Sequence, residues 1–377
     1  MMRKTTLFKA LALVACLLCS LSAVAAEAYA VYTPSNTTLT FYYDNSRSSR
    51  QGTVYDLNTG GNYPGWNEDG NQANVTSVVF KSSFANARPT TTYYWFGDMG
   101  NLVSITGISY LNTSQVTDMC MMFYNCTKLA SVDVSHFNTA KVTNMEWLFG
   151  NCRALTSLDL SNFNTAKITS MSGMFYCCNS LTSLDLRSFN TSQVTSMMGT
   201  FTSCYSLTSL DVTSFNTSKV INMGSMFQNC SSLTSLDLSS FTTEQLQITG
   251  YMFCDCSNLV TIYARDWNTE NVVNSTGMFG SCYKLVGGAG TVYDYEHWSD
   301  IEYARIDRGP SAPGYFTAKS IHGDINGDTR VDVGDVTLLI NYVLNSTPVD
   351  NAIADLNGDN RIDVADVTTL IQLILNN

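Results

Sequence analysis

Residues 189–212 read FNTSQVTSMMGTFTSCYSLTSLDV, and this stretch decides the fold because its pattern recurs every 26 residues. Within each repeat, Phe stands twelve residues after the first position, Cys follows three residues later, and Leu three residues after that. A fixed period of this length is typical of a solenoid, in which each repeat buries its apolar face only against its neighbours. The first positions of the seven repeats are Leu111, Phe137, Phe163, Phe189, Phe215, Phe241 and Trp267.

Each repeat combines two hydrophobic patterns. In the second repeat, the apolar side chains of residues 145–152 recur at the spacing of one face of a short helix. The next apolar side chains, Leu158 and Leu160, alternate as they do in a short strand. We therefore predict one short parallel strand and one short helix per repeat, an α/β architecture with the L-x-x-L-x-L spacing of a leucine-rich repeat.

The cysteines of the repeats favour buried thiols over a disulfide framework. Because they occupy the predicted helix face, we interpret them as small core residues. Disulfides between stacked repeats stay an alternative, since vertical neighbours would lie at a bridging distance. Three further cysteines, Cys120, Cys177 and Cys254, lie outside this column. The column consists of Cys126, Cys152, Cys178, Cys204, Cys230, Cys256 and Cys282.

The repeat region, residues 83–316 with a C-terminal cap included, resembles the 26-residue repeat of the BspA-like leucine-rich repeat family of bacterial surface proteins. The resemblance rests on the pattern quoted above for residues 189–212. It implies a secreted or cell-surface, non-catalytic binding protein, and some members of the family take part in adhesion. The ligand that it implies is a host or bacterial surface protein or a polysaccharide.

The N-terminal region is expected to hold an export signal and a cap. Basic residues precede an apolar run and then small residues, so residues 1–26 are predicted to be a cleaved signal peptide. A lipoprotein cleavage box at residues 13–16 is the alternative. We predict no integral membrane segment after signal cleavage. Residues 27–82 read as a β-rich cap containing a hairpin, and their aromatic side chains either pack the cap or line a sugar-binding platform.

The charge and the motifs of the chain exclude several functions. The formal net charge is −11, which argues against nucleic acid or an anionic membrane surface as a partner, because both attract basic patches. The three histidines lie far apart in the sequence, and neither an H-E-x-x-H nor a G-x-S-x-G motif occurs. We therefore expect no enzyme, and a glycoside hydrolase with paired carboxylates is the less favoured alternative.

A column of aspartates lies within the predicted strands of successive repeats. These side chains should point away from the core, beside a matching column of serines. Two interpretations stay open: a solvated face on which each carboxylate bonds to neighbouring hydroxyls, or a polar surface that binds a cationic or hydroxyl-rich ligand. The aspartates are Asp133, Asp159, Asp185, Asp211 and Asp237.

Two acidic segments near the C-terminus have the spacing of calcium-binding loops. In each segment, oxygen-bearing side chains occupy loop positions 1, 3, 5, 9 and 12, and a backbone carbonyl is available at position 7. Because Ca²⁺ takes about six to eight oxygen ligands, we predict two calcium ions. Each loop leads into a helix with one apolar face. The predicted ligands are Asp324, Asn326, Asp328, Arg330, Asp332 and Asp335 in the first loop, and Asp355, Asn357, Asp359, Arg361, Asp363 and Asp366 in the second.

This module, residues 324–377 after a linker at 317–323, resembles a type I-like dockerin domain because each loop runs directly into a helix and ends on Asp. The resemblance implies calcium-dependent folding and docking to a cohesin-like scaffold protein. It also implies that loop positions 10 and 11 help to select the partner. Those positions hold Val333 and Gly334 in the first loop and Val364 and Ala365 in the second. The matching halves would permit binding in two orientations.

Together these features predict a secreted or cell-surface binding or adhesion protein that attaches to a partner through its dockerin. The alternative is a non-catalytic targeting subunit, which would bring a polysaccharide-degrading complex to its substrate.

Overall fold

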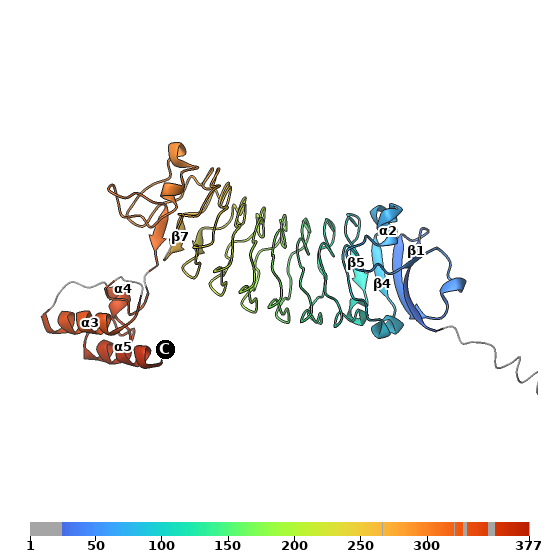
Figure 1. Cartoon of the computed structure of the whole chain (residues 1–377), viewed down its shortest axis with the longest axis horizontal. Helices are drawn as coiled ribbons and strands as arrows, with labels where there is room; N and C mark the ends of the chain where they lie inside the picture. The colour runs from blue at the N-terminus through green and yellow to red at the C-terminus, as the bar shows by residue number, and fades with distance from the viewer. Residues whose placement is uncertain (1–24, 266, 320, 327–329, 346–350, 377) are drawn as a thin grey trace, which may run out of the picture. The chain divides into compact units, whose positions relative to one another are not determined.

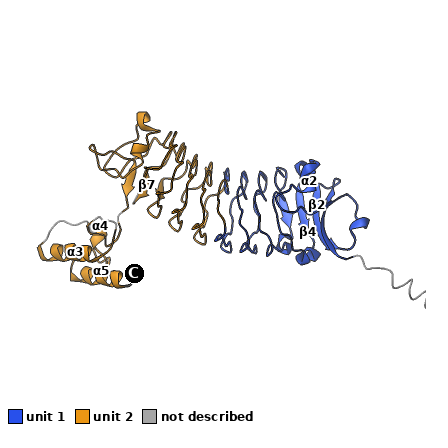
Figure 2. Cartoon of the chain, viewed as in Figure 1, with its two compact units in different colours: residues 1–167, 174–179 blue, residues 168–173, 180–377 orange. Residues whose placement is uncertain are grey.

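The computed structural model describes residues 25–265, 267–319, 321–326, 330–345 and 351–376. They form two compact units (Figure 2). Unit 1 contains the described residues up to Lys167 together with Met174–Asn179, and unit 2 contains Ile168–Gly173 and the described residues from Ser180 onward. The predicted signal peptide lies outside the described residues except for Ala25 and Ala26. Within the described ranges, no helix is long and apolar enough to cross a membrane.

Unit 1 begins with a five-stranded mixed sheet of order β3-β1-β2-β4-β5 (Figure 1). The predicted hairpin is confirmed: β1 and β2 pair antiparallel, β3 pairs antiparallel with β1, and β4 and β5 join in parallel. The strands are β1 (Glu27–Thr33), β2 (Thr38–Asp44), β3 (Thr53–Asp56), β4 (Ser77–Phe80) and β5 (Ser104–Thr106). One short helix, α2 (Gly65–Glu68), is accompanied by the 3-10 turns Arg47–Ser49, Asn71–Asn74, Ser82–Asn86 and Ile108–Tyr110.

Aromatic side chains fill the core beside this sheet. The ring of Phe41 stacks on Phe80 with centroids 4.5 Å apart and on Trp95 at 5.1 Å. Trp66 is fully buried, and its indole Nε1 donates a hydrogen bond of 2.8 Å to the carbonyl oxygen of Trp95. These aromatics, together with the buried Tyr29, therefore pack the cap, which supports that interpretation over a sugar-binding platform.

The segment of each repeat predicted as a helix is instead a succession of turns. In residues 145–152, Trp147 and Asn151 have left-handed φ angles of 55° and 62°. The N–H of Phe149 donates to the carbonyl oxygen of Met174 in the next repeat at 3.0 Å, whereas an α-helix would need bonds four residues back along the same segment. The helical prediction was wrong here because the same apolar spacing serves a turn segment in which the N–H groups of Phe149 and Asn151 bond to the next repeat. Those of Leu148, Gly150 and Cys152 bond three residues back.

The predicted stacking of repeats is confirmed by its side-chain columns. In unit 1, the rings of Phe123 and Phe149 stack at 5.4 Å, and in unit 2 those of Phe201 and Phe227 stack at 5.8 Å. Thiols of the cysteine column such as Cys152, Cys230 and Cys256 donate to the carbonyl oxygen of the Phe in the preceding repeat, at 3.0, 3.1 and 3.0 Å. All cysteines within the described residues are free thiols, as the interpretation of small core residues predicts. Burial raises the pKa of the Cys152 thiol to about 12.

Among the described residues of the seven repeats that begin at Leu111, regular strands occur only in the fifth and sixth repeats, in unit 2. In that unit, β6 (Ser235–Asp237), β7 (Thr261–Ala264) and β8 (Phe316–Ala318) form a three-stranded parallel sheet. Elsewhere, successive repeats are joined by isolated parallel bridges, such as Asp118 with Asn144 and Ser196 with Asn222. The prediction of a strand in every repeat was therefore too broad, although the alternation of apolar residues is present in the repeats. The predicted linker also begins later than residue 317, because β8 includes Thr317 and Ala318. The 3-10 turns Tyr295–His297 and Ile301–Tyr303 lie in the C-terminal cap of the repeats.

The C-terminal module contains the two predicted helices and a short third helix that the sequence analysis did not predict. These are α3 (Val333–Asn345), α4 (Asn351–Ala354) and α5 (Val364–Asn376). Their core consists of Leu339, Ala354, Val367 and Leu370, with partly buried neighbours that include Val336 and Ile374. The sequence placed Ile340 and Ile371 on the same buried faces, but the two side chains are exposed, because each lies at the margin of its apolar stripe.

Candidate metal site and binding surfaces

The second predicted calcium loop is organised by its first aspartate. Oxygen Oδ1 of Asp355 accepts backbone N–H bonds from Gly358 at 2.8 Å and Asp359 at 3.2 Å, and Oδ2 accepts one from Asn360 at 2.8 Å. Asn360 has a left-handed φ of 64°, which an Asn side chain tolerates. One carboxylate thus holds the tight turn that a small oxygen-ligand loop requires.

The last aspartate of each loop is buried at the start of a helix. Oxygen Oδ1 of Asp366 accepts the N–H of Leu356 at 2.8 Å and that of Asn357 at 3.2 Å, and Oδ2 accepts the N–H of Asp363 at 2.8 Å. Both Asp366 and Asp335 are fully buried. A buried carboxylate is costly unless it is hydrogen-bonded, and these bonds fix the loop against its helix.

The first loop repeats this arrangement around Asp335. Its Oδ1 accepts N–H bonds from Ile325 at 2.7 Å and Asn326 at 3.0 Å, and its Oδ2 accepts the N–H of Asp332 at 2.8 Å. The three donors occupy the same loop positions as those of Asp366. The predicted ligand Asp328 lies outside the described residues. The two halves are therefore equivalent at the bonds that close each loop.

The donor set fits a hard cation. In the second loop, four aspartates face a single arginine, Arg361, whose guanidinium lies 3.9 Å from Asp363 Oδ2. A divalent cation would relieve the repulsion among these carboxylates. In the described residues, no three carboxylate, imidazole or thiol side chains converge as metal ligands do, because the loop carboxylates turn toward backbone N–H groups. The oxygen donors and the tight turn nevertheless match what Ca²⁺ prefers.

The predicted partner residues lie at the first turns of α3 and α5. Val333 and Val364 are 71% and 66% exposed. The backbone N–H groups of Gly334 and Ala365 donate to the aspartates at loop position 9, at distances of 2.7 and 2.8 Å. A single exposed valine is common on a protein surface. Here the first turn of both helices carries an exposed valine at the equivalent position, which marks a candidate contact surface.

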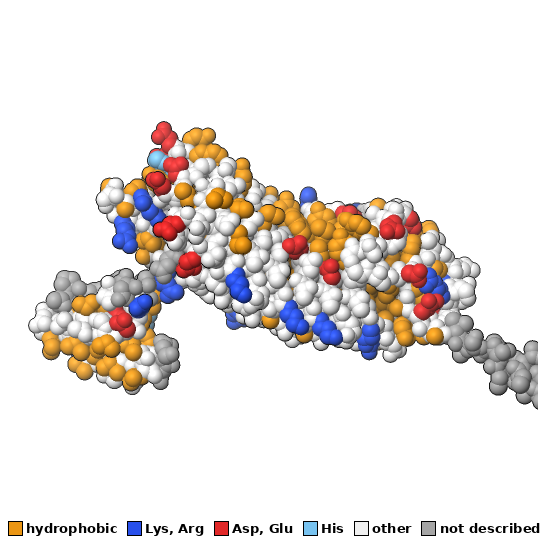
Figure 3. Space-filling view, in the orientation of Figure 1, with side chains coloured by type: hydrophobic (Ala, Val, Ile, Leu, Met, Phe, Trp, Pro, Cys, Tyr) orange, Lys and Arg blue, Asp and Glu red, His pale blue; other side chains and the backbone are white. Residues whose placement is uncertain are grey.

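Each helix carries further exposed apolar side chains that the sequence interpretation missed. Figure 3 shows hydrophobic side chains gathered on the C-terminal module. Leu344 and Leu375 are 73% and 78% exposed, and they lie eleven residues after Val333 and Val364. With Ile340 and Ile371 at seven residues, these side chains share one face of each helix. Their matched 31-residue spacing was the signal available in the sequence.

The aspartate column of the repeats makes local hydrogen bonds. Asp133, Asp159 and Asp211 each accept a hydroxyl bond of 2.6 Å from the Ser or Thr two residues later. Asp185 instead accepts two bonds from the guanidinium of Arg187, which hold the pKa of its carboxyl at about 2. Asp237 is half-buried and pairs with Lys319 at 3.1 Å. This geometry matches the solvated-face interpretation, and a role in ligand binding stays a prediction.

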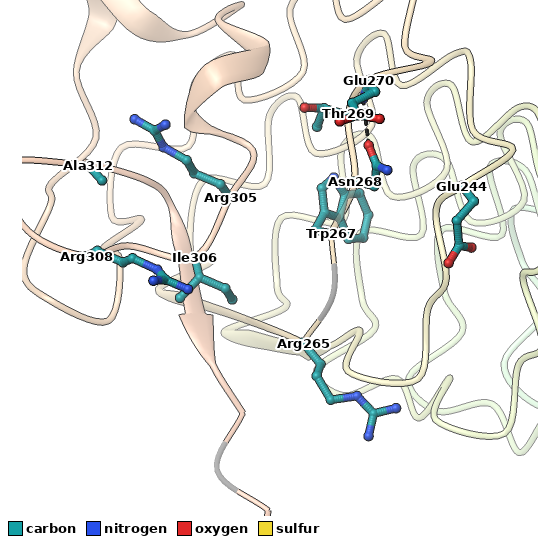
Figure 4. A pocket seen from close by; sticks show the side chains of 10 residues that line it. All are labelled: Glu244, Arg265, Trp267, Asn268, Thr269, Glu270, Arg305, Ile306, Arg308 and Ala312. Carbon is teal, nitrogen blue, oxygen red and sulfur yellow. Dashed lines mark hydrogen bonds between the residues drawn. The ribbon is translucent and has the colours of Figure 1, made fainter. Parts of the chain in front are cut away.

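A cavity of about 700 Å³ in unit 2 is lined by residues of the last repeats and their C-terminal cap (Figure 4). It combines Arg265, Arg305 and Arg308 with two carboxylates, Glu244 and Glu270. The carboxylates stand at the same repeat position, three residues after Phe241 and Trp267. The two carboxylates therefore belong to the 26-residue repeat pattern. A catalytic pair of carboxylates added to the repeats would lie outside this pattern.

The folded chain is thus a repeat solenoid joined to a paired-loop helical module. Family comparisons agree with this class: residues 90–209 and 178–288 match the model described as "Mycoplasma protein of unknown function, DUF285", and residues 322–375 match the type I dockerin domain. The DUF285 matches together span more than half of the chain, and the protein belongs to this family. The two resemblances predicted from the sequence are therefore confirmed.

Two solved structures are similar over most of their length. A leucine-rich repeat protein from Bacteroides ovatus is 14% identical, with a TM-score of 0.35 over 69% of this chain and 80% of its own. A leucine-rich repeat protein from Eubacterium ventriosum is 16% identical, with a TM-score of 0.26 over 70% of this chain and 82% of its own. No curated protein matches the chain.

The dockerin match carries general properties of that domain. Type I dockerin domains bind calcium, take a cohesin as partner, and occur in extracellular assemblies of the cellulosome type. Repeat and dockerin domains are typically non-catalytic, and the family comparisons identify no catalytic domain.

Proposed function

We propose that this protein is a secreted or cell-surface, non-catalytic binding protein. Its solenoid, residues 83–316 with the β-rich cap 27–82, recognises a host, bacterial or polysaccharide ligand. Its dockerin, residues 324–377, takes up two calcium ions and docks to a cohesin-like partner. An N-terminal signal peptide, residues 1–26, would direct the chain to export.

The observation that carries the docking half of this proposal is the equivalence of the two loops. Asp335 and Asp366 are both fully buried, and each accepts backbone N–H bonds from loop positions 2, 3 and 9. The predicted ligands of the two loops would hold the ions through carboxylate and carbonyl oxygens. The calcium supplies positive charge that neutralises each acidic loop, while the chain's own hydrogen bonds anchor the loop to α3 or α5.

The apolar pairs on α3 and α5 support a protein partner for this module. Val333 and Val364 stand at equivalent places on the two helices, as do Leu344 and Leu375. Exposed apolar stripes of this kind are favoured in protein interfaces, because contact with a partner removes their apolar surface from water. Because the stripes are equivalent, either helix can present the same contact to one partner surface.

A non-catalytic role is supported by the cavity of unit 2, whose two carboxylates occupy equivalent repeat positions. The solenoid offers long columns of repeated side chains, which suit extended recognition better than they suit a single reacting centre.

The test uses the full chain on immobilised type I cohesin domains, in calcium and in EDTA, by surface plasmon resonance. We expect binding in calcium and its loss in EDTA. Hydrogen–deuterium exchange of residues 322–375 in the two buffers checks that calcium orders the module itself. Equal exchange in both buffers, or binding that is indifferent to EDTA, would contradict the proposed docking function.

A further inference from the structure

A row of six aromatic side chains runs over the surface of unit 1. We name it the aromatic strip, and it consists of Tyr63, Tyr93, Tyr94, Tyr124, Trp147 and Tyr176. Neighbouring ring centroids are 4.7 to 6.4 Å apart from Tyr63 to Tyr176. Tyr63 is 50% exposed, Tyr94 is buried, and the other four rings are partly exposed, so five rings of the strip reach the surface. On the face drawn in Figure 3, hydrophobic side chains gather over the coils that follow the N-terminal sheet.

The strip is built by an alternation between two repeat positions. Tyr94 and Trp147 stand three residues before a glycine, Gly97 or Gly150. A Cβ at Gly97 would lie 2.4 Å from Cδ1 of Tyr94, and one at Gly150 would lie 3.1 Å from Cε3 of Trp147. Each ring therefore lies flat over a glycine of its own repeat. In the repeat between them and in the repeat after Trp147, the aromatic residue occupies the glycine position instead, as Tyr124 and Tyr176 do.

The backbone under two of these rings is strained. Tyr94 and Trp147 have φ angles of 58° and 55°, a left-handed conformation that bulky side chains rarely adopt. The equivalent position of two later repeats is Gly173 or Gly199, with φ angles of 60° and 61°. Glycine satisfies this backbone without strain, so the rings are present at a cost to stability. Met121, Ser225 and Tyr251 hold the same position in other repeats with φ angles of 56°, 56° and 57°, so the left-handed conformation belongs to the repeat and the side chain there is free to vary.

Polar side chains follow the strip through the same repeats. The amide of Asn125 donates to Asp98 at 2.8 Å, the amide of Asn151 donates to Asn125 at 2.5 Å, and Arg153 donates to Asn151 at 2.7 Å. The hydroxyl of Tyr94 also donates to Asp98 at 2.6 Å. The strip therefore combines aromatic surface with a row of oriented amide and carboxylate groups.

We propose that the aromatic strip binds a neutral polysaccharide chain laid along the repeats. The C–H faces of sugar rings pack on the negative faces of aromatic rings, through the quadrupole that also attracts cations. Sugar hydroxyls exchange hydrogen bonds with amides and carboxylates such as those beside the strip. The net charge of −11 and the carboxylate of Asp98 disfavour polyanionic glycans. This inference deepens the proposed function and rests on its claim that the solenoid is a binding surface.

The test is affinity gel electrophoresis of the full chain in native gels that contain hydroxyethyl cellulose, arabinoxylan or galactomannan, with polygalacturonate as the charged comparison. We expect retardation by at least one neutral polymer, equally in calcium and in EDTA, and none by polygalacturonate. Trp147→Gly installs the residue that Gly173 and Gly199 supply in other repeats, so it removes a ring without a new backbone demand. It should weaken binding at least tenfold, while Trp147→Tyr should restore most of it.

Tyr205→Ala is the matched control, because Tyr205 is 41% exposed but lies outside the strip, in unit 2. It should bind as the wild type does, and a cooperative thermal unfolding transition in each variant would show that the variants are folded. The inference is overturned if no neutral polymer retards the wild-type chain, or if Trp147→Gly binds as well as Tyr205→Ala. Capture by immobilised collagen that depends on Trp147, without polymer retardation, would also overturn it in favour of a protein ligand. Cohesin docking, measured separately in calcium, is unaffected by any of these results.

Discussion

The carboxylate of Asp366, at the first turn of α5, accepts the backbone N–H of Leu356 at 2.8 Å across ten residues of the second loop. Asp335 makes the same contact with Ile325 at 2.7 Å in the first loop. These bonds join each acidic loop to its helix, so the order of the loop and the position of the helix depend on one another.

Asp366→Asn should weaken the calcium-dependent order of the second loop. The substitution removes a negative charge and places a side-chain amide N–H against backbone N–H groups. A buried donor left without an acceptor in this way costs about 1–3 kcal/mol of stability. Hydrogen–deuterium exchange of residues 355–366 measures the effect, and exchange in calcium should rise toward the level found in EDTA. The control is Asp185→Asn, which alters an exposed aspartate of the repeats. Equal protection in the variant and the wild type would show that Asp366 does not close the loop.

Docking should survive the loss of one apolar stripe but not of both. Val333→Asp or Val364→Asp alone should reduce cohesin affinity by only a small factor, because the equivalent helix can take its place. The double variant should abolish binding while the calcium-induced protection of the loops remains. Surface plasmon resonance on an immobilised cohesin gives the affinities. Complete loss in either single variant would exclude binding in two orientations.

The cysteine column should be chemically silent in the folded protein. Cys152 is fully buried, its thiol donates to Phe123, and burial raises its pKa to about 12, so little nucleophilic thiolate forms. Alkylation by iodoacetamide followed by peptide mass spectrometry should label the half-buried Cys177 before Cys152. Cys152→Ala should lower the free energy of unfolding by about 1 kcal/mol through the space it leaves, whereas Cys177→Ala should cost less. Rapid labelling of Cys152 under native conditions would contradict this account.

The Asp185 carboxyl should titrate well below its ordinary pKa. Hydrogen bonds from Arg187 hold its pKa at about 2, against an ordinary value of 3.8. Because the pKa is lowered on folding, the stabilising contribution is present above about pH 4 and is lost as the pH falls toward 2. Both side chains are exposed, so the effect on global stability should be small. A carboxyl NMR titration should show the midpoint rising toward 3.8 in Arg187→Ala. An unchanged midpoint would mean that the pair does not form in solution.

The repeat register and the two acidic loops were predictable from the sequence. Columns such as Phe123, Phe149 and Phe175 recur at one spacing because stacked repeats bury the same position each time. The loop aspartates recur because each half of the module must make the same turn. The same register favoured buried thiols for the cysteine column but left disulfides between repeats as an alternative. The export signal stays a prediction, as does ligand binding by the solenoid.

The local backbone of the repeats was decided only by the tertiary structure. The apolar spacing of residues 145–152 suits a helix, but Phe149 gives its N–H to the next repeat and Trp147 is left-handed. No local pattern distinguishes those two outcomes, because the competing hydrogen-bond partner lies 25 residues away in the chain. The aromatic strip was hidden for a related reason. Its rings alternate between two repeat positions, so they form no column in the sequence and meet only when the repeats stack.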